Sequence, residues 1–227
     1  MAYAAAPYGV PAPAFVPRST CDDGFRVVSE TVLHRRYLAV FDRTVEFPAL
    51  PGATERLRFA YDVVGHPRSH FHFVTVFPFH ARAGAAGEPS ATMVREYAQG
   101  PNQLVWSFPA GGVDSAKHSS LEDAAAAELS EECALACSAP LVRLLPGDHP
   151  GLLESKWCMN RYTPFLAVEP LADAQPGPRD AEEALLSTHV VPLWRLEELL
   201  YGGDVVPHSV ITAHLALREL KARGLLS

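Results

Sequence analysis

The sequence predicts an α/β fold, with strands concentrated in the first half of the chain. Residues 25–47 and 57–79 are rich in β-branched and aromatic side chains, and Pro51-Gly52 and Gly65-His66-Pro67 interrupt them with turn signals. A helix signal appears only after residue 119, and two further helical patterns close the chain. A chain of 227 residues fits one large domain of this class.

The individual elements follow from local patterns. Residues 25–47 should form two strands, and residues 57–64 and 71–79 one strand each. Shorter strands are expected at 93–97 and 104–108, on either side of the turn Gly100-Pro101-Asn102. Later strands are expected at 141–145, 160–168 and 185–191. The closing helices are expected at 193–201, before the stop signal Gly202-Gly203, and at 209–222.

The chain is expected to divide unevenly. Residues 1–20 are rich in Ala, Pro and Tyr, which suits a flexible tail better than a secretory or transit leader. Residues 21–60 should form an N-terminal β segment of the domain. Residues 61–227 should form its core together with the C-terminal helices.

Composition excludes several classes of partner. Nineteen basic and 26 acidic residues give a formal net charge of −7 without a Lys/Arg cluster, so no nucleic-acid partner is expected. No apolar run reaches the ~18 residues of a membrane span, so no membrane partner is expected either. Four cysteines without a CxxC pair favour a reducing compartment. We expect a cytoplasmic location, with organellar targeting left open.

The helix expected between residue 121 and about residue 133 carries the most informative side chains. Ser119 and Ser120 precede a carboxylate by three residues, which is a capping-box pattern. Glu128, Glu131 and Glu132 follow at i, i+3, i+4 and crowd one helix face. Three repelling carboxylates without a nearby Lys or Arg favour a hard divalent cation. A solvated acidic face is the alternative.

A glycine turn precedes this helix in Phe108-Pro-Ala-Gly-Gly-Val-Asp114. Gly111 and Gly112 have no Cβ, so the backbone there can closely approach an anion or a metal ion. Both glycines are therefore candidate substrate-binding positions.

Turn and helix together resemble the Nudix box, whose second half reads Arg-Glu-aliphatic-any-Glu-Glu-any-Gly-aliphatic. Glu128, Leu129, Glu131, Glu132 and Leu135 match that pattern. Ala127 stands in place of the family's Arg, Ala134 in place of its Gly, and Ser119 in place of its first Glu. The interval from Gly111 to Glu128 is also two residues too long.

Further motifs resemble the branch of this family that cleaves ADP-ribose and nucleotide sugars. They are Pro109-Ala110-Gly111 and Val94-Arg95-Glu96-Tyr97. The resemblance implies an α/β/α sandwich with a mixed central sheet over residues 21–227. It also implies Mg²⁺ or Mn²⁺ on Glu128, Glu131 and Glu132 with the Ala110 carbonyl, and a substrate contact from Arg95.

A general base is expected on the acidic stretch after the Pro- and Gly-rich loop at 171–180, which we expect to be mobile. The family commonly holds this base on the loop before the penultimate strand, where Asp180, Glu182 and Glu183 stand in this chain. We expect Glu183 first and Glu182 second, because Asp180 lies closer to the Pro-rich part of the loop. If the base instead comes from the box itself, Glu131 is the first candidate.

The function implied is metal-dependent hydrolysis of the diphosphate bond in a nucleoside diphosphate-linked small molecule. ADP-ribose or an ADP-sugar would give AMP and a sugar phosphate. The alternative is a Nudix-fold module, catalytically impaired, that senses nucleotides or binds proteins. A homodimer remains open in either case.

Overall fold

The computed structural model describes residues 24–83, 87–179, 183 and 185–226. The chain divides into two compact units between Pro67 and Arg68. This boundary lies just after the third strand, whereas the sequence placed the start of the core at residue 61. The expected tail at 1–20 lies outside the described residues.

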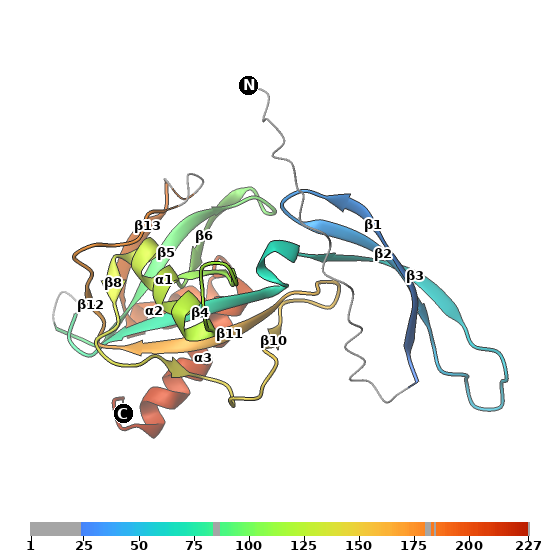
Figure 1. Cartoon of the computed structure of the whole chain (residues 1–227). Helices are drawn as coiled ribbons and strands as arrows, with labels where there is room; N and C mark the ends of the chain where they lie inside the picture. The colour runs from blue at the N-terminus through green and yellow to red at the C-terminus, as the bar shows by residue number, and fades with distance from the viewer. Residues whose placement is uncertain (1–23, 84–86, 180–182, 184, 227) are drawn as a thin grey trace. The chain divides into compact units, whose positions relative to one another are not determined.

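The first unit is a three-stranded antiparallel sheet of β1 (Arg26–Arg35), β2 (Ala39–Glu46) and β3 (Arg58–Gly65) (Figure 1). The register places Glu46 directly opposite Arg26 on one side and Arg58 on the other. Both arginines donate to the Glu46 carboxylate, at 3.1 and 2.8 Å. One central carboxylate therefore joins the ends of all three strands.

The second unit contains a mixed eight-stranded sheet with the order β10-β11-β4-β5-β13, to which β6, β7 and β9 are attached. Its long strands are β4 (His72–His80), β5 (Ser90–Ala98), β11 (Arg161–Val168) and β13 (Ser187–Pro192). The shorter strands are β6 (Gln103–Ser107), β7 (Ala110–Gly112), β9 (Val142–Arg143) and β10 (Leu152–Leu153). Strands β4 and β11 run parallel, and the other pairs are antiparallel.

Helices cover both faces of this sheet. Helix α1 (Leu121–Cys133) packs on one face, and α2 (Leu193–Tyr201) and α3 (Pro207–Ala222) pack on the other (Figure 1). Strand alternation divides the core accordingly. Val74 and Val76 of β4 pack with α1, whereas Phe77 and Phe79 pack with α2 and α3. The result is the α/β/α sandwich expected from the sequence.

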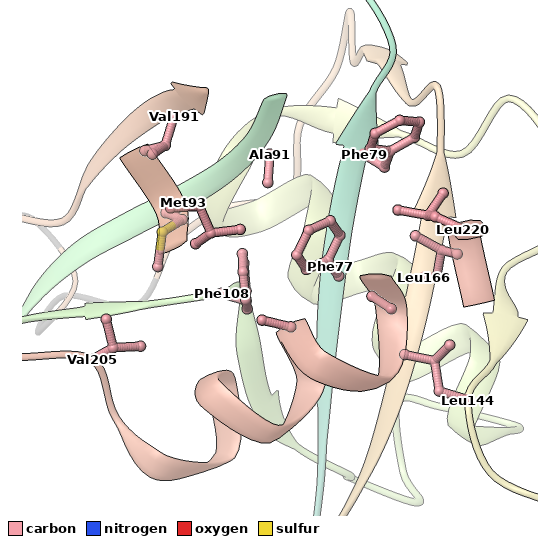
Figure 2. Close-up of a cluster of buried hydrophobic side chains, with 13 residues drawn as sticks. Phe77, Phe79, Ala91, Met93, Phe108, Leu144, Leu166, Val191, Val205 and Leu220 are labelled. Carbon is pink, nitrogen blue, oxygen red and sulfur yellow. The ribbon is translucent and has the colours of Figure 1, made fainter. Parts of the chain in front are cut away.

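The core on the α2/α3 side is aromatic at its centre. Phe77 and Phe108 lie with ring centroids 4.7 Å apart, and both are fully buried (Figure 2). Burying a side chain of this size contributes roughly 1.5–3 kcal/mol. These contacts anchor β4 and the segment leading into β7. Among the described residues, no helix is both long and apolar enough to span a membrane.

The two ends of α1 differ in their chemistry. At its start the Ser120 hydroxyl accepts a hydrogen bond from the Asp123 amide at 3.0 Å, which confirms the expected cap. At its end Ala134 adopts the left-handed conformation, with φ of 52°. This is the position of glycine in a common C-terminal cap. For alanine the same conformation costs roughly 1–2 kcal/mol.

We therefore predict that Ala134→Gly stabilises the protein by about 0.5–1 kcal/mol, since relief of the strain exceeds the added entropy of the unfolded chain. The matched control is Ala127→Gly inside the same helix, which should destabilise the protein by about 1 kcal/mol. Denaturant unfolding of both variants measures the difference. Equal destabilisation by both glycines would contradict the strain at Ala134.

Candidate functional site

The segment that enters α1 lies directly against the helix glutamates. Strand β7 pairs with β4, and its middle residue, Gly111, faces Glu128. A Cβ built on Gly111 would lie 1.9 Å from Glu128 Oε1. The backbone of β7 and the Glu128 carboxylate can occupy these positions only because residue 111 has no side chain. Gly111 thus serves a close approach, as its sequence context predicted, but the approach is to a carboxylate of the protein itself.

Glu132 lies deeper in the same junction. The Ala110 amide donates to Glu132 Oε2 at 3.0 Å, and Glu132 is only 4% exposed. Burial raises the pKa of Glu132 well above its ordinary value, and repulsion from neighbouring carboxylates, with Glu128 the strongest, raises it further. A solvated acidic face is therefore wrong for this residue.

Two more carboxylates join from other elements. Glu96 of β5 and Glu183 both contribute to the raised pKa of Glu132. The pKa of Glu96 is itself raised, mainly by burial and then by Glu183, against a hydrogen bond from Ser107. We call Glu96, Glu128, Glu132 and Glu183 the glutamate cluster. Sequence reasoning missed Glu96, because strand alternation puts neighbouring Arg95 and Glu96 on opposite faces without indicating which face α1 covers.

Arg95 lies on the opposite face of β5 from Glu96. Its guanidinium lies over the Trp106 ring, 5.5 Å from the centroid, and Trp106 packs against the core on the α2/α3 side. Glu96, in contrast, lies on the α1 side with the cluster. The structure does not bring Arg95 together with the glutamates, and its contact with substrate stays a prediction. Gly112 faces Ser69 rather than the glutamate cluster, since a Cβ on Gly112 would lie 2.9 Å from Ser69 Cβ.

Glu131 is separated from the other helix glutamates. It lies under the following loop, where a Cβ on Gly177 would come within 2.5 Å of Glu131 Cγ. Residues 171–179 of that loop are fastened rather than free, because Ser130 donates to Asp173 at 2.7 Å and accepts from the Gly177 amide at 3.1 Å. The alternative base, Glu182, lies outside the described residues.

The pKa of the Cys133 thiol, at the end of α1, is shifted by burial and by the charged groups around it. Burial raises the pKa of Cys133, the nearby Glu132 raises it further, and Arg179 opposes both. A buried thiol with a raised pKa is a poor nucleophile. Cys133 is therefore a packing residue, and the effect of Arg179 on its pKa places a guanidinium near the same helix end.

The donor set suits Mg²⁺ or Mn²⁺ in kind, because such cations prefer carboxylate and carbonyl oxygens. Glu128 and Glu132 supply these oxygens beside the Ala110 backbone. Within the described residues, no group of three or more His, Cys, Asp or Glu side chains could hold a metal ion as it stands. The predicted triplet does not converge, because Glu131 faces the loop. The metal site therefore stays a prediction that rests on donor chemistry.

Comparisons with known proteins agree with the architecture. No protein-family model matches the chain, and no curated protein matches its sequence. Among solved structures, the fold is similar to the crystal structure of an ADP compounds hydrolase, with a TM-score of 0.67. The two chains are 20% identical, and the match covers 89% of this chain and 97% of the other. The similarity confirms the fold class.

Gly111→Ala should disrupt the junction, because its Cβ would overlap the Glu128 carboxylate. We expect a loss of roughly 1–3 kcal/mol of stability, the usual cost of overpacking, unless Glu128 rotates away. The control is Gly100→Ala, where a Cβ meets nothing within 4 Å. Thermal unfolding measures stability, and a crystal structure would show the Glu128 rotamer. Indistinguishable stability and an unmoved Glu128 in both variants would contradict the contact.

Glu132→Gln should stabilise the metal-free protein at neutral pH. The folded state keeps the Glu132 proton to a higher pH than the unfolded chain, whose ordinary pKa is 4.5, so this carboxyl destabilises the fold progressively as pH rises above that value. Gln cannot ionise and lacks this loss. With a chelator present, the variant should melt above the wild type at about pH 8, and the gap should close toward about pH 4.5. The matched control is Glu122→Gln, which removes an exposed carboxyl group from the same helix.

Proposed function

We propose that the protein is a hydrolase that cleaves the diphosphate bond of a nucleoside diphosphate-linked compound. The observation that carries this proposal is the glutamate cluster, in which Glu132 is buried and repelled by three further carboxylates. A fold gains no stability from such repulsion, so the cluster needs a functional reason. The similarity in fold to an ADP compounds hydrolase supports the same reaction class.

We propose that Glu128 and Glu132 hold Mg²⁺ or Mn²⁺ together with the Ala110 carbonyl. When bound, a divalent cation neutralises diphosphate charge and polarises its P–O bonds. The protein's own contribution is to fix the two carboxylates. The Ala110 amide orients Glu132, and the absence of a side chain on Gly111 leaves room for Glu128.

We assign the general base to Glu183. Its carboxylate would accept a proton from the attacking water as the new P–O bond forms. The bridging P–O bond then breaks, and its electron pair leaves with the departing phosphate. The location of Glu183 beside Glu96 and Glu132 supports this choice. Glu182 remains the second candidate and Glu131 the third.

ADP-ribose and ADP-sugars are the substrates to test first, with AMP and a sugar phosphate as products. The resemblance of Pro109-Ala110-Gly111 to the ADP-ribose branch supports them, as does the fold similarity. Arg95 lies on the opposite face of β5 from the glutamate cluster, with its guanidinium over the Trp106 ring.

The test is product analysis after incubation with Mg²⁺ and a panel of nucleoside diphosphate compounds. We expect AMP from at least one ADP-linked compound. Glu183→Gln should lower kcat at least ~100-fold, the lower end of general-base contributions, with metal affinity by calorimetry nearly unchanged. Glu132→Gln should weaken metal affinity as well, and Glu122→Gln, on the exposed first turn of α1, should change neither.

The possible outcomes separate the candidate functions. Binding of nucleotides without turnover on any compound would replace the hydrolase by a nucleotide-sensing module. Turnover that Glu183→Gln leaves intact would move the base to Glu182 or Glu131. An absence of both turnover and nucleotide binding would reject the proposal.

A further inference from the structure

The end of α1 is joined to a loop that comes about fifty residues later in the chain. Arg179 is the residue that makes this connection. Its Nε donates to the Glu131 carbonyl at 3.1 Å, and its Nη2 donates to the Glu132 carbonyl at 2.6 Å. Its Nη1 donates to the Leu186 carbonyl at 3.0 Å. All three nitrogens of one guanidinium thus bind main-chain oxygens.

The helix end needs such a donor. The last carbonyls of an α-helix lack partners within the helix, and they carry a partial negative charge. The last turn of α1, which is described in full, adds Glu131 and Glu132 and contains no basic residue. A cation supplied from another segment offsets this unfavourable placement. The planar fork of arginine is suited to several acceptors at once, whereas lysine is a point charge.

Thr188 of β13 strengthens the same junction. Its hydroxyl donates to the Glu132 carbonyl at 3.1 Å and lies 3.4 Å from Arg179 Nη2. The backbone of Glu132 therefore receives two donors from outside its helix. The Ala110 amide also binds the Glu132 side chain, so hydrogen bonds hold both the backbone and the carboxylate of this residue.

The third contact of Arg179 reaches the turn that carries Glu183. The Leu186 amide donates to the Glu183 carbonyl at 2.9 Å, which closes a tight turn between the two residues. The Leu186 side chain is buried against α1. Because Arg179 binds the Leu186 carbonyl, one side chain bridges the Glu183 turn and the backbone of Glu132.

We propose that Arg179 is a positioning residue, which holds the Glu183 turn against the end of α1 and so sets the distance between Glu183 and Glu132. Its effect on catalysis rests on the proposed function. Its effect on the loop does not, and it is measurable without any substrate.

The first experiment is hydrogen exchange by mass spectrometry on the wild type, Arg179→Ala and Arg179→Lys. The matched control is Arg195→Ala, which removes an exposed arginine paired with Glu198 on α2. Loss of charge-assisted hydrogen bonds in Arg179→Ala should speed exchange in residues 171–179 and in the end of α1 at least ~10-fold. Exchange in β1–β3 should not change. Exchange in Arg179→Lys should be intermediate between that of the wild type and that of Arg179→Ala. The lysine variant replaces the alanine variant if the latter does not fold.

The second experiment measures kinetics on the substrate identified for the wild type. Arg179→Ala should lower kcat at least ~10-fold while KM changes less than about twofold, because a displaced base affects the chemical step rather than binding. Guanidinium ion at millimolar concentration should restore part of the lost kcat in Arg179→Ala and none in Glu183→Gln. Arg195→Ala should match the wild type.

These outcomes separate the two proposals. Unchanged exchange in a folded Arg179→Ala variant overturns the inference. Faster exchange with wild-type kcat removes the positioning role and leaves a structural clamp only. If the wild type hydrolyses no nucleoside diphosphate compound, the proposed function fails, and the exchange result alone still decides whether Arg179 fastens the loop.

Discussion

The candidate site depends on one buried carboxylate, Glu132, at the junction of β7 and α1. Moving a charged group out of water costs several kcal/mol unless hydrogen bonds compensate. Here one main-chain donor, the Ala110 amide, faces the carboxylate. Ala110 lies opposite Thr75 in the β7–β4 pair, and its amide donates to Glu132 rather than to β4. The close approach of β7 to α1 also requires the glycine at 111, because a Cβ there would overlap the Glu128 carboxylate.

The long elements were predictable because their signals are local. The cap at Ser120, the end of α1 at Cys133 and the strands β4 and β11 depend on neighbouring residues, and the structure agrees with each. Helix α3 begins at Pro207, two residues before the expected start, because proline fits the first helical position. Strands β7, β8 (Leu135–Ala136) and β12 (Leu171–Ala172) were not predicted, since three residues or fewer carry no period.

The candidate site was harder to predict, because its members meet through tertiary structure. Spacing correctly put Glu128, Glu131 and Glu132 within one arc of the helix, but an arc of ~100° is wide enough to face two neighbours. Glu128 and Glu132 face β7 and the sheet, and Glu131 faces Gly177. The place of Glu96 in the site could not be predicted, because both faces of β5 are buried. Met93 packs on the α2/α3 side and Val94 on the α1 side. No local pattern says which face α1 covers.

Four carbonyls near the end of α1 are divided between the strained cap residue Ala134 and the distant Arg179. The amide of Ala134 donates to the Leu129 and Ser130 carbonyls, at the expense of a left-handed alanine. The next two carbonyls, of Glu131 and Glu132, are bound by Arg179. Each donor satisfies the acceptors that the other does not reach. The last turn of α1 and Arg179 thus depend on each other for these hydrogen bonds. This mutual dependence ties the location of the proposed base to the geometry of the glutamate cluster.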